Sequence, residues 1–222
     1  MRLLQFRSAR RAQGWTQHEA AARLGVSQAY YSQLEGGTRP LSPELARKAV
    51  RKFKLSPVNL PLPALELTVG AVDPDLLTAE LAGLGYPGFA HLPKAVVKSN
   101  PAELIVQSLV HASLDTRLVE ALPWVLATFP DLDWTWLAAQ CRLLNLQNRL
   151  GFLLTLADKL GPNRQTEALQ LLEASRLAVE GTLCRDTMGA PMRNWVRTNR
   201  PPEAAHWNLL TTLSVKDLTH AA

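Results

Sequence analysis

Two helix-start signals with one glycine between them constrain the fold of this chain more than any other part of its sequence. Thr16 precedes Glu19 by three residues, the spacing of a capping box, in which each side chain satisfies a free backbone N–H at a helix start. Gly25 can adopt the positive φ at which a helix ends, and Ser27 can cap a second helix after a turn of about three residues. The sequence therefore predicts a helix-turn-helix whose first helix begins near Gln17.

The second helix, residues 28–35, has one face for packing and one polar face. At about 100° per residue, Tyr31 and Leu34 fall together, where they can share a small core with the preceding helix. The opposite face carries Gln28, Ala29, Ser32 and Gln33. A glutamine amide can pair with the edge of an adenine in the major groove, so this face predicts a surface that reads DNA bases. The alternative is a small helical bundle whose glutamines are ordinary surface residues.

The positive charge of the chain is concentrated around this segment. Residues 1–56 contain eleven Lys or Arg against three Asp or Glu, a net charge of +8, whereas the rest of the chain has a net charge of −3. Basic residues around a base-reading helix supply the attraction to phosphates that is behind most non-specific DNA affinity. The charge distribution favours double-stranded DNA as the partner of the N-terminal residues.

A longer pattern surrounds the two helices. It consists of Arg10, G-W-T-Q from Gly14 to Gln17, Ala21, L-G-V-S from Leu24 to Ser27, and Y-S-Q-L-E-G-G-T-R-P from Tyr31 to Pro40. With this pattern, residues from about 3 to 56 resemble the Cro/CI-type (XRE family) helix-turn-helix domain of bacterial and phage repressors, a lambda-repressor-like bundle. That family usually adds a fifth helix, but the proline-rich K-L-S-P-V-N-L-P-L-P stands here, so we expect that helix to be short or replaced by packing from the second domain.

The resemblance implies a role for each polar residue of the segment. The bases would be faced by Gln28, Ala29, Ser32 and Gln33. Gln17 would touch the phosphate backbone and brace Gln28, and phosphates would also be approached by Thr38, Arg39 and, as a further contact, Arg11. A structural pair would form between Arg10 and Glu35. The resemblance therefore implies a sequence-specific DNA-binding transcriptional regulator.

Prolines mark a boundary after the basic segment. Pro57, Pro61 and Pro63 interrupt the helical periodicity where the charge balance changes, so we expect a DNA-binding domain over residues 1–60 and a second domain over residues 64–222. Beyond the boundary, apolar residues recur at three- and four-residue spacing and alternating strand patterns are hard to find. The sequence thus predicts an all-α chain with a larger helical second domain.

The second domain contains no motif that predicts catalysis. G-L-G-Y-P-G, residues 83–88, follows a helix-like rather than a strand-like segment, so we interpret it as a helix end and turn instead of a dinucleotide site. Asp131 and Asp133 stand just before a helix and are interpreted as caps rather than metal ligands. Cys141 and Cys184 are expected to be buried thiols. We therefore predict no enzyme activity, catalytic residue, metal or cofactor. No apolar run is long enough to cross a bilayer, so we predict a cytoplasmic protein.

Four features of the second domain are compatible with binding of a further partner. Asn145, Asn148 and Arg149 share a helical face that is either solvated or bound to a partner, and Arg193, Arg197 and Arg200 form a basic cluster that is either an ordinary surface or a further nucleic-acid contact. Five of the six tryptophans lie beyond residue 64, in the core or at an interface. Residues 118–157 are also similar to second domains of helix-turn-helix regulators that are paired with nucleotidyltransferase-like toxins.

These observations predict a repressor that forms a homodimer through residues beyond 64. One alternative is an antitoxin that represses its own operon and neutralises a toxin protein through the second domain. A second alternative is an enzyme of nucleic acids that the helix-turn-helix delivers to DNA, which would require a cleft with clustered, perturbed titratable groups.

Overall fold

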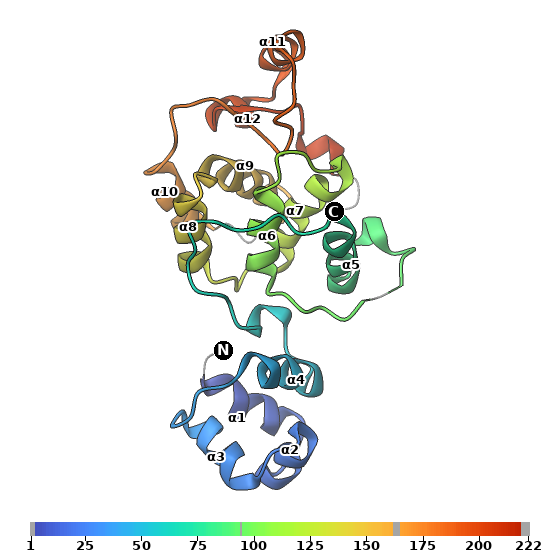
Figure 1. The fold of residues 1–222 in the computed structure, drawn as a ribbon, viewed down its shortest axis with the longest axis vertical. Coiled ribbons are helices and arrows are strands. Elements are labelled where there is room, and N and C mark those ends of the chain that lie inside the picture. Colours follow the sequence, from blue (N-terminus) through green and yellow to red (C-terminus); the bar gives the residue numbers. More distant parts are fainter. Residues whose placement is uncertain (1–2, 94, 162–164, 219–222) are drawn as a thin grey trace. The chain divides into compact units, whose positions relative to one another are not determined.

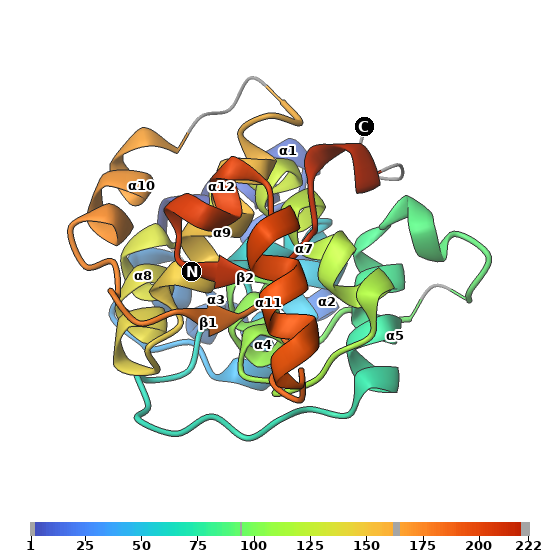
Figure 2. The ribbon, with the colours of Figure 1, turned by 90° about the horizontal axis from the view of Figure 1, so that it is seen from above.

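The structure, a computed structural model, describes residues 3–93, 95–161 and 165–218. The chain divides into two compact units, of which unit 1 lies within Met1–Leu62 and Lys98–Asn100 and unit 2 within Pro63–Val97 and Pro101–Ala222. Helices dominate both units, as the ribbon shows (Figure 1), and a view at right angles to it (Figure 2) shows the two short strands β1 and β2 among the helices of unit 2. The predicted all-α fold is confirmed.

Unit 1 is built from short helices with well-formed caps. Its elements are α1 (Leu3–Ala12), α2 (Gln17–Leu24), α3 (Gln28–Gly36), α4 (Pro43–Phe53) and the 3-10 turn η1 (Pro57–Asn59). Thr16 and Glu19 form the predicted capping box, and Gly25 ends α2 with a φ of 73°. Ser27 and Ser42 accept hydrogen bonds from the backbone N–H three residues on and so cap α3 and α4. The local signals in the sequence therefore set these boundaries.

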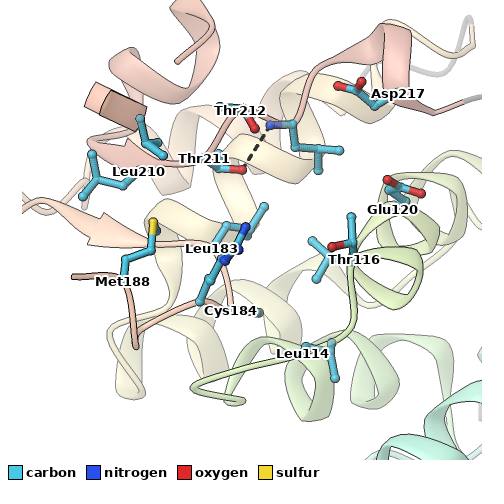
Figure 3. Close-up of a pocket in the computed structure, with 14 residues that line it drawn as sticks. Leu114, Thr116, Glu120, Leu183, Cys184, Met188, Leu210, Thr211, Thr212 and Asp217 are labelled. Atoms are coloured by element: carbon cyan, nitrogen blue, oxygen red, sulfur yellow. Dashed lines mark hydrogen bonds between the residues drawn. The ribbon is translucent and has the colours of Figure 1, made fainter. Parts of the chain in front are cut away.

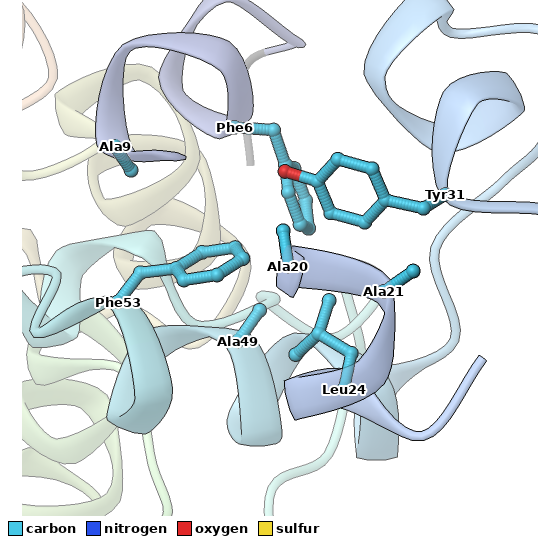
Figure 4. Packing of buried hydrophobic residues seen from close by; sticks show 8 residues of the cluster. All are labelled: Phe6, Ala9, Ala20, Ala21, Leu24, Tyr31, Ala49 and Phe53. Carbon is cyan, nitrogen blue, oxygen red and sulfur yellow. The ribbon is translucent and has the colours of Figure 1, made fainter. Parts of the chain in front are cut away.

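The core of unit 1 is an aromatic cluster with small residues between the rings (Figure 4). Phe6, Tyr31 and Phe53 contact one another edge to face, with ring centroids 5.8 to 6.5 Å apart. Edge-to-face pairs add about 0.5–1.5 kcal/mol beyond their buried area. Ala20 and Ala49 are fully buried beside the rings. Three helices, α1, α3 and α4, each contribute one ring, so the cluster fixes α3 against its neighbours.

The proline-rich end of unit 1 contains no long helix among the residues that the structure describes. Only the three-residue turn η1 follows α4, in agreement with the expected short fifth element. Asn100 returns to this turn, and its Nδ2 donates to the carbonyls of Val58 and Leu60 at 2.9 and 2.7 Å. The sequence pattern gave no sign of this contact, because the two segments are about 40 residues apart.

Unit 2 consists of helices around a buried central helix, α9. Its elements are α5 (Pro74–Leu84), η2 (Pro87–Phe89), α6 (Pro101–Leu109), α7 (Thr116–Thr128), α8 (Trp134–Leu143), α9 (Gln147–Ala157), α10 (Thr166–Glu173), β1 (Gly181–Thr182), α11 (Ala190–Asn199), α12 (Pro202–His206), β2 (Leu209–Leu210) and η3 (Val215–Asp217). Nine of the eleven residues of α9 are buried, which is typical of a helix that packs on all sides. Helices α7, α8, α10 and α12 pack against it.

Two short strands connect distant parts of unit 2. β1 and β2 pair in parallel, with Gly181 opposite Leu209 and Thr182 opposite Leu210. Nearby, the indole of Trp207 is buried against α9, where its Nε1 donates to Thr155 Oγ1 at 2.9 Å. These contacts fix the C-terminal segment onto the central helix.

Several sequence interpretations of unit 2 are confirmed. Gly85 ends α5 with a φ of 94° and η2 follows directly, so residues 83–88 form a helix end and a turn. Asp133 caps α8 by accepting from the backbone N–H of Trp136. Cys141 and Cys184 are both buried, and neither forms a disulfide. In the described part of the chain, no helix has the length and apolar character needed to span a membrane.

Candidate nucleic-acid interface

The candidate interface is built on α3, the second helix of the helix-turn-helix. Its inner face buries Tyr31, Leu34 and Glu35, of which Tyr31 belongs to the aromatic core. Burial raises the pKa of Tyr31 to about 12, so its hydroxyl stays protonated and neutral within the core. The side chains of Gln28, Ala29, Ser32 and Gln33 are exposed on the remaining surface of the helix. The helix therefore offers one polar strip to a partner, supported by a rigid core.

A network of four side chains holds the start of this strip. Arg10 Nε donates to Glu35 Oε1 at 2.6 Å, and Arg10 Nη1 donates to the carbonyl of Trp15 at 2.8 Å. Gln17 Nε2 donates to Glu35 Oε2 at 2.8 Å. Gln28 Nε2 then donates to Gln17 Oε1 at 2.9 Å. The structure thus connects Arg10, Glu35, Gln17 and Gln28 in one chain of hydrogen bonds.

Glu35 lies at the centre of this network, because it accepts hydrogen bonds from both Arg10 and Gln17. Its side chain is only 1% exposed, and burial alone would favour its neutral form. Hydrogen bonds from Arg10 and Gln17, together with the positive charge of Arg10, outweigh the burial and hold the pKa of Glu35 below its ordinary value. The carboxylate hydrogen bond likewise raises the pKa of Arg10. A charged Glu35 can only accept hydrogen bonds.

The charged state of Glu35 determines how the amide groups of Gln17 and Gln28 are oriented. Since the Glu35 carboxylate accepts, Gln17 must direct its NH₂ group toward Glu35 and its oxygen toward Gln28. Gln28 must then donate with its own NH₂ group, which leaves one N–H and the carbonyl oxygen of Gln28 directed elsewhere. The exposed end of Gln28 therefore presents one donor beside one acceptor.

The loop after α3 carries the remaining residues assigned to phosphates. Thr38 Oγ1 donates to the carbonyl of Gln33 at 3.2 Å, which attaches the loop to the end of the helix. The guanidinium of Arg39 lies over the ring of Tyr30, 4.5 Å from its centroid. Such a cation–π contact restricts a long side chain that would otherwise be free to rotate. Arg11 is exposed near the end of α1, outside the network.

Tyr30 is a residue that the sequence analysis missed. It neither packs in the core cluster nor belongs to the polar strip, yet it orients Arg39. The sequence offered little sign of this contact, because it shows only a tyrosine on the recognition helix and an arginine in the loop that follows. Arg23 has a similar contact with Trp15, at 4.1 Å from the ring centroid.

The polar residues of α9 serve unit 2 itself. Asn148 donates to the carbonyl of Leu177 and accepts from its N–H, at 2.9 and 2.8 Å. Arg149 donates to the carbonyls of Thr182, Leu109 and His111. Asn148 is buried and the side chain of Arg149 is 14% exposed, so the interpretation of a solvated face is wrong for these two residues. Contacts within unit 2 occupy the polar groups that a partner was expected to bind. Asn145, the third residue of the predicted face, is exposed but lies between α8 and α9 with a φ of 57°, so the three residues do not share one helical face.

The basic cluster around α11 is occupied by contacts within unit 2. Arg197 and Arg200 both bind the carboxylate of Glu180, with shortest distances of 2.6 and 3.1 Å. Arg193 donates to the carbonyls of Met188 and Asp186. These contacts favour the interpretation of an ordinary charged surface over that of a second nucleic-acid site.

Nothing in the described residues assembles a metal site, since no group of three His, Cys, Asp or Glu side chains lies close enough there to hold an ion. Among the thiols, burial raises the pKa of Cys184 to about 11 and that of Cys141 above its ordinary value. Both thiols therefore remain protonated at neutral pH and are poor nucleophiles.

The comparisons with known proteins agree with the geometry of unit 1. Residues 6–60 match the family model described as helix-turn-helix, which covers α2, α3 and the supporting helix α4. The comparison with curated proteins and the comparison with solved structures each gave no match. The match supports an XRE-type helix-turn-helix in a DNA-binding transcription regulator.

Proposed function

We propose that the chain is a sequence-specific regulator of transcription that inserts α3 into the major groove of double-stranded DNA. The observation that carries this proposal is the polar strip of α3, whose first glutamine is oriented by the buried Arg10–Glu35 pair through Gln17. A recognition helix gains specificity when its base-reading side chains are held in one orientation before binding.

The orientation of Gln28 favours one base. Adenine presents an acceptor, N7, beside a donor, the N6 amino group, in the major groove, whereas guanine presents two acceptors. A side chain with one free N–H beside a carbonyl oxygen matches adenine, and Gln28 is held in that state. Gln33, Ser32 and Ala29 then contact bases further along the strip, and the methyl group of Ala29 suits thymine.

Contacts to phosphates position the helix. Thr38 and Arg39 approach one strand from the loop after α3, with Arg39 held by Tyr30. Gln17 keeps one N–H for a phosphate at the start of α2, and Arg11 adds a further positive charge. Since each neutralised phosphate releases counterions, we expect the affinity to fall along a clear slope in a plot of log affinity against log salt concentration.

The test is a binding selection from random double-stranded DNA with the wild-type chain and with Gln28→Ala and Gln33→Ala. Each substitution should remove the base preference at its own position, at a cost of roughly 1–3 kcal/mol. Gln13→Ala, a glutamine outside the helix-turn-helix, is the matched control and should retain the wild-type preference. Unchanged base preference in both test variants would refute the assignment.

We also propose that unit 2 forms the homodimer. Unit 2 exposes several large apolar side chains, among them Leu67, Val179 and Trp195 at 76%, 78% and 58% exposure. A two-fold contact there could hold two recognition helices about 34 Å apart, the spacing of successive major grooves. Light scattering on the full chain and on residues 64–222 should give dimers, and a monomer in either sample contradicts this proposal.

Repression follows from such a dimer if its operator overlaps a promoter. The alternative is an antitoxin, for which the support is the resemblance of residues 118–157 to second domains of toxin-paired regulators. Genome-wide recovery of bound DNA distinguishes the two, since an antitoxin should bind upstream of its own gene beside a toxin-like gene. The DNA-targeted enzyme stays the second alternative; burial keeps both cysteines of unit 2 protonated at neutral pH, so neither offers it a thiolate nucleophile.

A further inference from the structure

Unit 2 contains a cavity of about 350 Å³ at the edge of its strand pair (Figure 3). Three chain segments and one side chain of α11 line it: residues 114–120 at the start of α7, residues 183–188 after β1, residues 210–217 at and after β2, and Val196. Its volume lies in the range of small-molecule sites, roughly 300–1,000 Å³. The cavity belongs to unit 2 alone and lies outside the proposed DNA-binding residues.

The parallel strand pair explains why the cavity exists. Parallel strands leave their ladder at the same end, so the segments after β1 and β2 emerge side by side. The segment after β1 contacts the residues just before α7 through Cys184 and Arg185, and residues 211–217 run to η3. The space between the two segments and the start of α7 is left unfilled by side chains.

The wall formed by residues 183–186 is firmly attached. Leu114 donates its backbone N–H to the carbonyl of Cys184 at 3.0 Å, and Asp186 donates its own to Ala112 at 2.7 Å. Arg149 Nη2 binds the carboxylate of Asp186 at 2.9 Å. Cys184 has a φ of 51°, a left-handed backbone that non-glycine residues rarely adopt without such support. A cavity held in this way loses little entropy on binding a ligand.

The lining separates apolar groups from charged groups. Met188 and Leu210 lie on one side of the cavity, and Glu120 and Asp217 lie on the other, with Thr116 between (Figure 3). The apolar lining is completed by Leu114, Val119, Leu183, Val196 and Leu213. The charged groups of the lining are the carboxylates of Glu120 and Asp217 and the guanidinium of Arg185.

We propose that this cavity binds a small primary ammonium compound with a compact aliphatic body. The ammonium group would donate to Glu120 and to Asp217, whose Oδ2 already accepts from the N–H and hydroxyl of Ser214, leaving Oδ1 for a ligand. The aliphatic body would contact Leu210 and Met188 on the opposite side. A carboxylate on the same ligand could reach Arg185, so both simple amines and apolar amino acids share this chemistry.

The test uses calorimetry on the full chain with four probes of similar shape: 3-methylbutylamine, leucine, 3-methylbutanol and 4-methylpentanoate. The proposal expects saturable binding of the amine, of leucine or of both, with a parallel rise in the unfolding temperature. Stronger binding of leucine than of the amine would assign Arg185 to the ligand carboxylate. Binding of only the alcohol or the anion, or of none of the four, would overturn the proposal.

Two substitutions locate the site. Glu120→Gln keeps the size of the side chain but removes its charge, and it should weaken binding of the ammonium probe by about tenfold or more. Thr116→Phe, at the exposed first residue of α7, should block the cavity and abolish binding without a charge change. Glu167→Gln, on α10 outside the cavity, is the matched control and should bind as the wild type does. Wild-type affinity in both test variants would place any observed binding elsewhere and refute the proposal.

Discussion

Gln28 and Gln17 are joined by a hydrogen bond of 2.9 Å in which Gln28 is the donor. The direction of this bond follows from the buried Glu35, which accepts from Gln17 at 2.8 Å and cannot donate in its charged form. The buried carboxylate of Glu35 thus selects one of the two possible orientations of the Gln28 amide at the surface. We therefore expect the buried ion pair to affect the proposed base specificity as well as stability.

Removal of this connection should relax the preference for adenine. In Gln17→Ala, the amide of Gln28 loses its fixed acceptor and can turn to present two N–H groups, which suit the two acceptors of guanine. We expect the discrimination between adenine and guanine at that operator position to fall by about 1 kcal/mol or more, roughly fivefold. Competition binding with operators that differ at this one base pair measures the change.

Gln13→Ala is again the control, since Gln13 has the same side chain on a different segment. A Gln17→Ala variant that binds more weakly but discriminates as the wild type does would mean that Gln17 contributes only a phosphate contact.

The Arg10–Glu35 pair should be strongly coupled in stability. The Glu35 side chain is 1% exposed and that of Arg10 is 14% exposed, so removal of either leaves a charge with inadequate partners. Each of Arg10→Ala and Glu35→Ala should lower the free energy of unfolding of unit 1 by about 3–5 kcal/mol. The double variant should cost less than the sum, with a coupling of about 0.5–3 kcal/mol. Denaturant unfolding of the four proteins gives the cycle, and strictly additive losses would contradict the pairing.

The same pair predicts how stability responds to acid. The pKa of Glu35 is lowered in the folded chain from an ordinary value of 4.5. A lowered pKa stabilises the folded state above that ordinary value, and the stabilisation is lost as the pH falls through the folded pKa. Glu35→Gln removes the titrating group, so the difference in unfolding free energy between it and the wild type should be constant from pH 6 to 8 and shrink below about pH 4.5. A difference that stays constant to pH 3 would show that Glu35 does not titrate in this way.

The helix-turn-helix could be predicted in detail because its signals are local. Thr16 and Ser27 each cap a helix through a residue three positions away, and Gly25 ends a helix by its own backbone freedom. The exposed strip on α3 follows from helical periodicity alone. Such features depend only on residues that are close together in the sequence, so they can be predicted from a single sequence.

The polar residues of unit 2 could not be interpreted in this way. Asn148 and Arg149 interrupt an apolar helix, which indicates either a solvated face or a partner. In the structure their partners are backbone groups and the carboxylate of Asp186, 29 to 40 residues away in the same unit. Asn100 likewise binds the backbone carbonyl of Leu60, which is 40 residues away in the sequence. Helical periodicity shows on which face of a helix a polar side chain lies. Whether that side chain binds water, a partner or the chain's own backbone depends on tertiary contacts, which periodicity does not show.

Gly151 provides a final test of the unit 2 core. It lies in the middle of α9, where alanine would ordinarily favour the helix by about 1 kcal/mol. A Cβ at this position would meet three ring atoms of Trp207 at 2.4 to 2.5 Å, far inside van der Waals contact. The indole cannot easily move away, because it is 2% exposed and its Nε1 donates to Thr155.

Gly151→Ala should therefore destabilise unit 2 by about 1–3 kcal/mol despite the better helix propensity. Gly161→Ala is the matched control, since a Cβ there meets nothing within 4 Å, and it should unfold as the wild type does. If the clash is the cause, then Gly151→Ala should cost less in a Trp207→Leu background than in the wild type, because the smaller side chain leaves room for the methyl group. Denaturant unfolding distinguishes the outcomes: equal stability of the two glycine variants would mean that α12 and α9 are not packed through this contact.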